Sequence, residues 1–404
     1  MGKRALDGVM VADFGWVIAA PICTKFLADL GATVIRIEST RRPDTIRTNS
    51  PYAEGKPGLN RSSYFTFFNA NKYSMSIDLN QPRGAEVARS LVKRSDIVIE
   101  NFIPGMMKRW GLTYEDLTKV KPDIIMASLG MQGQTGPYAR HRGYGIQLAG
   151  LVGFTELTGW PDRPPVQPYG ALTDVTASDF AAAAIISALI YRQKTGKGQY
   201  LDLSQTEASL QFLAPVSLDY TVNGREPSRL GNSCRYAAPH STYRCQGEDR
   251  WCAIAVTNDK EWTAFCRVLG NPDWTKETRF ATLLSRKRNE AELDRLVESW
   301  SSRFTPEDVM QRLQAAGVPA GVVQNSRDGY YDAHLEARKH FWKMKHPEMG
   351  MVTHLGQSFQ MSKTPVGPRM PAPCLGEHTE FVCREILGMP DEEFVELLQQ
   401  GVLV

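Results

Sequence analysis

The chain has 404 residues, of which 42% are hydrophobic and 23% are charged, and its formal net charge at pH 7 is +3. This length allows about two to three domains with cores of their own, and the composition is ordinary for a soluble globular protein. The small net charge argues against nucleic-acid binding. No apolar run reaches the roughly 18 residues that cross a bilayer, and no cleavable signal is evident, so we expect no membrane association.

The first part of the chain alternates strand and helix patterns. Residues 9–14 form an apolar run typical of a buried strand, a helix is expected over residues 21–30, and a second strand over residues 33–37. The alternation continues with a strand at 73–79, a helix at about 82–94, and strands at 96–100 and 123–129. This order predicts a parallel sheet covered by helices, a Rossmann-like α/β architecture.

The loops of this sheet lack two common nucleotide signatures. No Gly-x-Gly-x-x-Gly follows the first strand, and no Walker A sequence is present. The sequence therefore argues against a nicotinamide-dependent enzyme and against a P-loop nucleotidase. Residues 130–137 are rich in glycine with a different spacing. We interpret them as a loop at the carboxyl end of a strand, where open α/β sheets bind ligands.

A long helix pattern with an acid at its start is the strongest local signal. Asp174 precedes an alanine-rich run that ends at the turn Thr195-Gly196-Lys197-Gly198. On local pattern, Asp174 is more often a helix N-cap, because its side chain can accept a hydrogen bond from the first turn. The alternative is a nucleophile that attacks an activated acyl group.

After this helix, the pattern of predicted strands and helices indicates a second, smaller α+β domain. Residues 241–256 predict a hairpin, and helices are expected at 259–269, 289–302 and 306–316. We assign residues 1–200 to the N-terminal part of the large domain, 201–227 to a linker, 228–330 to the small domain, and 331–404 to a linker and a C-terminal part that completes the large domain.

Cysteines and histidines give no metal signature. Seven cysteines are scattered without a Cys-x-x-Cys pair, and the seven histidines are dispersed. We therefore expect neither a disulfide framework nor a metal, and a reducing cytoplasm as the compartment.

Several short motifs occur in a specific order along almost the whole chain. They are Asp13-Phe14 to Glu38, Phe68 to Lys72, Glu100 to Gly105, Arg109 to Leu112, Thr195 to Gln199 and Leu375 to Thr379. On these motifs the chain resembles the family III CoA-transferases of the CaiB/BaiF type. The resemblance implies transfer of CoA from an acyl-CoA donor to a carboxylic acid.

The resemblance implies roles for individual residues. The family nucleophile lies at a fixed distance before the Thr-Gly-x-Gly turn, which identifies Asp174, 22 residues before Gly196. It would form a mixed anhydride and then an aspartyl-CoA thioester, with acyl-CoA as a substrate and no permanently bound cofactor. The positions that match CoA-binding residues of relatives are Trp16, Ile18, Ile77, Asn101, Phe102, Arg109, Arg142 and Tyr144; Arg41, Arg42 and Lys72 are near the same region.

Three positions depart from the family pattern or bear on the substrate. Ser178 replaces a usual glycine, and Ser39 replaces an arginine. Ile18 stands where oxalate enzymes have a glutamine, which favours acids larger than oxalate. Overall similarity favours succinyl-CoA with a substituted succinate such as benzylsuccinate, and Arg235 and His240 are candidates to bind a distal carboxylate.

Two alternatives remain beside the transferase. An α-methylacyl-CoA racemase of the same family would need a histidine in a Gly-His-Asp sequence, where this chain has Gly143-Tyr144-Gly145. A non-catalytic subunit of a heteromeric CoA-transferase is the other. The resemblance also implies an obligate dimer of interlocked, ring-like chains, either a homodimer or a heteromer with a paralogous subunit.

Overall fold

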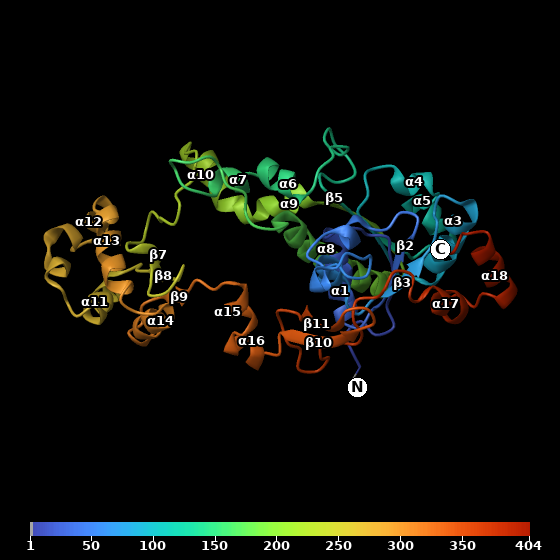
Figure 1. Ribbon diagram of the computed structural model, residues 1–404. Coiled ribbons are helices and arrows are strands. Elements are labelled where there is room, and N and C mark those ends of the chain that lie inside the picture. The colour runs from blue at the N-terminus through green and yellow to red at the C-terminus, as the bar shows by residue number, and fades with distance from the viewer. Residues whose placement is uncertain (1–2) are drawn as a thin grey trace. The chain divides into compact units, whose positions relative to one another are not determined.

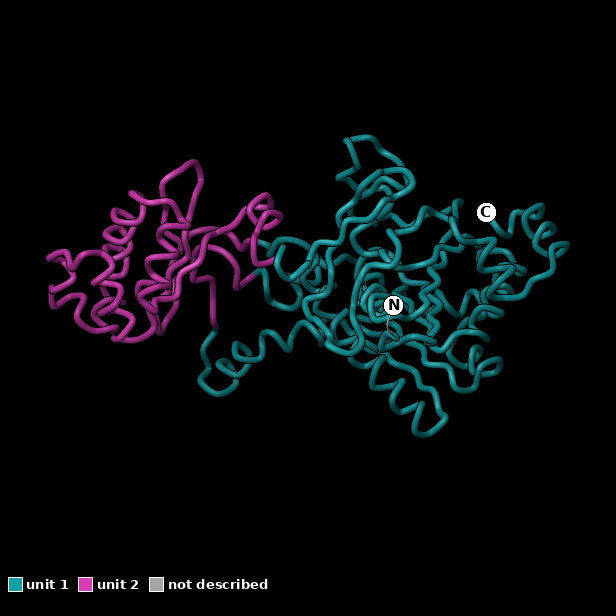
Figure 2. Tube along the Cα trace, turned by 90° about the horizontal axis from the view of Figure 1, so that it is seen from below, with its two compact units in different colours: residues 1–155, 167–226, 336–404 teal, residues 156–166, 227–335 magenta. Residues whose placement is uncertain are grey.

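The computed structural model describes residues 3–404, and these residues form two compact units (Figure 2). Unit 1 comprises residues 3–155, 167–226 and 336–404. Unit 2 comprises residues 156–166 and 227–335. The chain therefore leaves unit 1 and returns to it, so that its first and last parts belong to the same unit.

A six-stranded, fully parallel sheet organises unit 1 (Figure 1). The strand order is β3-β2-β1-β4-β5-β6, the doubly wound arrangement in which the order reverses between β1 and β4. The strands are β1 (Met10–Asp13), β2 (Thr33–Glu38), β3 (Tyr73–Ser76), β4 (Ile97–Glu100), β5 (Ile125–Gly130) and β6 (Tyr200–Ser204). The predicted α/β fold is confirmed, and β6 adds a strand where the sequence predicted a linker.

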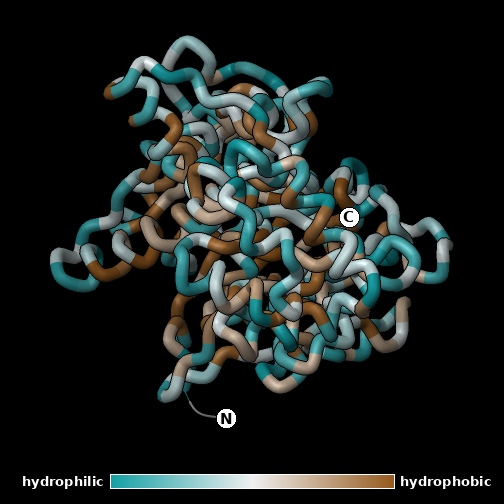
Figure 3. The backbone as a smooth tube through the Cα atoms, turned by 90° about the vertical axis from the view of Figure 1, so that its left-hand side faces the viewer, coloured by the Kyte–Doolittle hydropathy of each residue, from teal (hydrophilic) through white to brown (hydrophobic). Residues whose placement is uncertain are grey.

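Helices cover both faces of this sheet because its central strands are apolar on both sides. Side chains such as Val11, Val34 and Ile99 pack with α1 (Ala19–Asp29) and α8 (Leu172–Thr195). On the other face, Ala12, Ile35 and Val98 pack with α3 (Pro82–Arg94) and α5 (Tyr114–Val120). Figure 3 shows hydrophilic residues along much of the periphery of the view.

The C-terminal segment completes the second face. Val382, Cys383, Phe394 and Leu397 belong to its core, and a bridge pairs Ile77 with Leu403. The segment contains α17 (Thr379–Phe381), a π-turn at Val382–Ile386 and α18 (Asp391–Gln399), and it is preceded by the antiparallel pair β10 (Phe341–His346) and β11 (Gly350–Leu355).

Helix α8 begins at Leu172, two residues before Asp174. Its N-cap is Ala171, no side chain caps it, and Asp174 lies within its first turn. The local prediction of Asp174 as an N-cap is therefore wrong. Gly196, with φ of 72°, ends the helix in the left-handed conformation.

Helix α8 is, within residues 3–404, the one helix long and apolar enough to cross a membrane by length and composition. Its residues Ala181, Ala182, Ile185 and Ala188 are buried in the core of unit 1. The helix thus has the character of a core helix.

The other helices of unit 1 are shorter. They are α2 (Ser63–Asn69), α4 (Met106–Arg109), α6 (Gly145–Val152), α9 (Gln205–Leu210) and α10 (Ala214–Asn223), with 3-10 turns at Thr45–Thr48, Ala53–Gly55 and Gln211–Leu213. Two more short helices, α7 (Phe154–Leu157) and α16 (Ala333–Ala337), lie where the chain changes unit.

Unit 2 is built on a three-stranded antiparallel sheet, β7 (His240–Arg244), β8 (Trp251–Ala255) and β9 (Ala320–Val322). Tyr243, Ile254, Phe265 and Trp300 are among the buried residues of its own core. Its helices are α11 (Asp259–Val268), α12 (Leu283–Arg288), α13 (Glu290–Ser301), α14 (Pro306–Ala315) and α15 (Ser326–Tyr330), with 3-10 turns at Asp273–Lys276 and Thr278–Phe280.

Candidate active site

A cavity of about 680 Å³ lies at the carboxyl edge of the parallel sheet and is lined by Asp174. Val17 and Ile18 follow β1, Asn101 and Phe102 follow β4, and Met131 follows β5, and all of them line the same cavity. Loops after parallel strands meet at one edge of a sheet, so residues far apart in sequence converge here.

Asp174 occupies a half-buried position with few polar neighbours. Within residues 3–404, no hydrogen bond or ion pair reaches its carboxylate. Burial raises the pKa of the Asp174 carboxyl to about 6. A carboxylate without partners keeps both oxygens free to react, and it is ionised at neutral pH.

Gly145 leaves the space that the Asp174 carboxylate occupies. A β-carbon at position 145 would overlap Oδ2 of Asp174 and approach Oγ1 of Thr173 within 3.0 Å. Because Gly145 is the first residue of α6, the carboxylate lies beside the first turns of two helices, α6 and its own α8. The positive ends of both helix dipoles favour the ionised carboxylate and oppose the effect of burial.

A second cavity, of about 420 Å³, is lined by aromatic rings and by arginine side chains. The Trp16 and Phe102 rings pack edge to face with centroids 5.7 Å apart, and the Arg42 guanidinium lies 5.8 Å from the Trp16 ring. Arg41 pairs with Asp78 at 3.4 Å. Arg42 and Arg109 have no acidic partner in the described part of the chain, and such guanidiniums suit phosphate oxygens.

The structure brings most of the predicted CoA residues to these two cavities. Ile18, Asn101, Arg142 and Tyr144 line the cavity of Asp174. Trp16, Ile77 and Arg109 line the second cavity, and Phe102 lines both. Since Phe102 is shared, the two cavities are neighbours within unit 1.

Three predicted residues lie elsewhere. Lys72 is fully buried and donates to Asp13 at 3.3 Å and to the Pro21 carbonyl at 2.9 Å, so it stabilises the fold and faces neither cavity. Arg235 and His240 belong to unit 2, where His240 contacts the Asn232 carbonyl at 2.8 Å. Neither of these two lines the cavity of Asp174.

Ser178, which replaces the family glycine, has a defined structural role. Its buried hydroxyl lies 2.6 Å from the Ala19 carbonyl of α1 and 2.7 Å from the Asp174 carbonyl of its own helix. The hydroxyl therefore connects the start of α1 to the turn of α8 that carries Asp174. Asp179, the other aspartate of α8, is exposed.

Sequence reasoning missed four residues at or behind the site: Val17, Asp44, Gly145 and Gln205. Val17 has a left-handed backbone with φ of 64°, and Asp44 accepts a hydrogen bond from its N–H. Gln205 is 4% exposed and lines the cavity of Asp174. Only the glycine-rich run around residue 145 carried a sequence signal, because the other three depend on contacts between distant segments.

Comparison with known proteins agrees with this geometry. The sequence profile of CoA-transferase family III matches residues 6–379. A relative from Chloroflexus aurantiacus, succinyl-CoA–D-citramalate CoA-transferase, is 31% identical over 99% of this chain and 98% of its own length. The succinate–glutarate CoA-transferase of Agrobacterium fabrum is also 31% identical, over 95% of this chain and 96% of its own.

A solved structure shows the same fold. The crystal structure of a CaiB/BaiF family protein from Brucella suis has a TM-score of 0.87 and 33% identity, covering 96% of this chain and 100% of that one. The fold and site define a CoA-transferase, an enzyme that transfers CoA between an acyl-CoA and an acid. The chain belongs to CoA-transferase family III.

Proposed function

We propose that Asp174 is the nucleophile of this CoA-transferase and carries the acyl group and then CoA as covalent adducts. The observation that supports this most directly is a half-buried carboxylate, free of partners, on the wall of a cavity at the carboxyl edge of the sheet. A structural carboxylate in such a place would be hydrogen-bonded or paired, because burying an unpaired charge is costly.

The proposed reaction begins with attack of the Asp174 carboxylate on the thioester carbonyl of the donor. The C–S bond breaks, CoA leaves as a thiolate, and a mixed anhydride remains. The thiolate then attacks the aspartyl carbonyl, releasing the donor acid as a carboxylate and leaving an aspartyl-CoA thioester. The acceptor carboxylate repeats both steps in reverse, so that it leaves as the new acyl-CoA and Asp174 is restored.

The second cavity offers a site for the nucleotide of CoA. Trp16 and Phe102 provide aromatic surface, and Arg42 and Arg109 provide unpaired guanidiniums for phosphates. The shared Phe102 marks where the pantetheine arm passes toward Asp174. We propose Asn101, Ile18, Arg142 and Tyr144 as contacts along this path.

We propose succinyl-CoA as the donor and a dicarboxylic acid larger than oxalate as the acceptor. The two relatives described above act on succinate or succinyl-CoA together with citramalate or glutarate, by their names. Substituted succinates, benzylsuccinate among them, are the acceptors to compare with glutarate. Arg235 and His240 remain candidates for the distal carboxylate.

The racemase alternative has less support. Tyr144 stands where that chemistry needs a histidine, and its phenol is a weak base near neutral pH. Asp174 lines a cavity of about 680 Å³, which disfavours the alternative of a non-catalytic subunit with a blocked pocket. The seven free cysteines are in keeping with the reducing cytoplasm proposed as the compartment.

Trapping the adduct tests the proposal. The protein is incubated with succinyl-CoA and separately with glutaryl-CoA and acetyl-CoA, treated with hydroxylamine or borohydride, and digested for mass mapping. We expect modification of the peptide that contains Asp174, and no modification at that position in Asp174→Asn. Asp179→Asn, an exposed acid on the same helix, should be labelled like the wild type. A label on another residue, or transferase activity retained in Asp174→Asn, would refute the role of Asp174.

A further inference from the structure

The loop Gly15–Ile18 contributes residues to both cavities of the proposed site. Trp16 lines the second cavity, which contains Arg42 and Arg109, and Val17 and Ile18 line the cavity of Asp174. A CoA thioester that occupied both cavities would therefore contact this loop. The position of its backbone therefore decides whether both cavities fit one ligand.

The loop contains an unfavourable backbone conformation. Val17 has φ of 64°, in the left-handed region that a β-branched residue rarely adopts. Such a conformation persists only where surrounding contacts impose it. The contacts on this loop therefore point to what holds it.

Side chains from neighbouring strands and loops bind the backbone of the loop residue by residue. Asp13 accepts from the Gly15 N–H at 2.9 Å, and Arg36 donates to the Gly15 carbonyl at 2.8 Å. Asn101 binds both the N–H and the carbonyl of Trp16, each at 2.8 Å. Asp44 accepts from the Val17 N–H at 2.9 Å, so the strained residue has a carboxylate as its partner.

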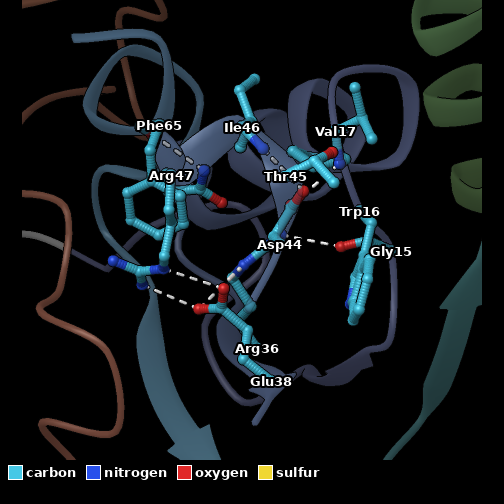
Figure 4. Close-up of polar contacts among 12 residues, drawn as sticks. Gly15, Trp16, Val17, Arg36, Glu38, Asp44, Thr45, Ile46, Arg47 and Phe65 are labelled. Atoms are coloured by element: carbon cyan, nitrogen blue, oxygen red, sulfur yellow. Dashed lines mark hydrogen bonds and ion pairs between the residues drawn. The ribbon is translucent and has the colours of Figure 1, made fainter. Parts of the chain in front are cut away.

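Asp44 belongs to a buried, charge-balanced network (Figure 4). Arg36 pairs with Asp44 and Glu38, Arg47 pairs with Glu38 at 2.8 Å, and Lys72 pairs with Asp13. The side chains of Arg36, Glu38, Asp44 and Arg47 are all fully shielded from solvent. A network of this kind is rigid, because a displaced member would leave an unpaired buried charge.

We propose that Asp44 is a positioning residue that holds Val17 in its left-handed conformation and so fixes the loop that lines both cavities for CoA binding. This rests on the proposed function of those cavities. One oxygen, Oδ2, accepts from both Val17 and Arg36, while Oδ1 accepts from the Ile46 N–H at 3.1 Å. An asparagine cannot serve these three donors in either orientation, since its amide nitrogen faces either the Ile46 N–H or both the Val17 N–H and the Arg36 guanidinium.

A matched pair of variants separates positioning from stability. Asp29 is also a fully buried carboxylate with three donors, namely Lys25 at 2.6 Å, Asn71 at 2.6 Å and Gln357 at 2.7 Å, and it lines neither cavity. Asp44→Asn and Asp29→Asn should both lower the melting temperature. Only Asp44→Asn should raise the Kd for CoA and the KM for the acyl-CoA, by about tenfold or more, the loss expected for a charge-assisted hydrogen bond.

A second pair of variants changes Val17 and leaves the charged side chains of the network unchanged. This pair tests the proposal even if Asp44→Asn does not fold. Val17→Ala keeps the N–H that Asp44 binds, whereas Val17→Pro removes it and fixes φ near −65°. We expect Val17→Pro to bind CoA about tenfold or more weakly than Val17→Ala, as measured by calorimetry.

The outcomes distinguish this inference from the function on which it rests. A wild-type protein that binds no CoA would overturn both. A wild type that binds CoA, together with a folded Asp44→Asn variant whose Kd stays within about twofold of Asp29→Asn, would overturn the positioning role alone. If Asp44→Asn does not fold, equal CoA affinity of Val17→Pro and Val17→Ala overturns it.

Discussion

The ionisation of Asp174 links the stability of the protein to the role proposed for this residue. Burial raises the pKa of this carboxyl to about 6, whereas an unfolded chain would titrate it near 3.9. Below both values the carboxyl is protonated in both states and contributes no difference. As the pH rises from about 3.9 to about 6, the unfolded chain releases this proton while the folded state still holds it, so stability falls with rising pH and the loss is complete above about 6.

Asp174→Asn should therefore stabilise the protein at neutral pH. The burial cost is on the order of 3 kcal/mol and the lost interaction with the helix ends about 1 kcal/mol, leaving a net gain of about 2 kcal/mol. Urea unfolding at several pH values measures it. The difference between variant and wild type should shrink toward acidic pH, and a difference independent of pH would contradict the assigned ionisation.

Gln205 gives a second prediction at this scale. Its Oε1 is buried and has no hydrogen-bond partner in the described part of the chain, and the residue lines the cavity of Asp174. Gln205→Leu should raise the free energy of unfolding by about 1 kcal/mol, because it removes an unsatisfied polar atom. If the amide binds substrate, kcat/KM should fall by about tenfold or more in the same variant.

Ser76→Ala is the matched control for this prediction. The Ser76 hydroxyl is also buried without a partner, but Ser76 lines neither cavity. It should gain stability with unchanged kinetics. A Gln205→Leu variant that is stabilised and fully active would show that the amide takes no part in the reaction.

Single residues show where sequence patterns stop being informative. The distance to the Thr195–Gln199 turn indicated Asp174 as the candidate nucleophile, although its local pattern favoured an N-cap that the structure does not contain. Gly145 and Asp44 act through contacts with segments 29 and 27 residues away, at Asp174 and Val17. No periodicity or capping rule reports such contacts, because they depend on how the loops fold over the sheet edge.

Among the elements, α8 and α1 are coupled through Ser178, which contacts the carbonyls of Ala19 and Asp174. We expect Ser178→Ala to lower the free energy of unfolding by about 1 kcal/mol, the typical value of a buried hydrogen bond. Thermal and urea unfolding measure this loss. The acylation rate of Asp174 should also fall, because the turn that carries it is no longer held by α1.

Ser187→Ala provides the comparison on the same helix. The Ser187 hydroxyl makes the same bond to a carbonyl four residues earlier, Ala183 at 2.8 Å, but it is exposed and, within residues 3–404, has no hydrogen bond to a second helix. Its loss should change stability by less than about 0.5 kcal/mol. Equal effects of the two substitutions would show that the contact with α1 contributes nothing.

Regular elements with strong patterns were predictable from sequence. The helix expected at 82–94 spans Pro82–Arg94, and the strand expected at 33–37 spans Thr33–Glu38, because an apolar stripe or run specifies both. Strand β6 was missed, since Tyr200–Ser204 is short and polar at alternate positions. Helix α6 was missed as well, because its first turn follows directly from a glycine-rich loop.

For the whole molecule, an uncovered apolar helix supports the proposed oligomer. None of the residues of α10 is buried, and Leu218, Tyr220 and Val222 are 60%, 56% and 75% exposed. We expect an exposed apolar face of this kind to contact another chain. We expect light scattering to give about twice the chain mass of 45.1 kDa.

Two glutamates on this helix should dissociate the oligomer. Leu218 and Val222 are four residues apart and share one face of α10, so Leu218→Glu with Val222→Glu places two charges in the contact. Val395→Glu with Leu398→Glu on α18, where both side chains are less than half exposed, should leave the mass unchanged. A wild-type mass of 45.1 kDa would contradict the oligomer itself.

The missing side chain at Gly145 also limits how this enzyme could acquire a new chemistry. Installing the Gly-His-Asp sequence of a racemase would require histidine at Tyr144 and aspartate at Gly145. The β-carbon of that aspartate would collide with the Asp174 carboxylate. Interconversion of the two chemistries on this scaffold therefore requires a backbone shift at the start of α6, and a two-residue exchange alone should yield an enzyme with neither activity.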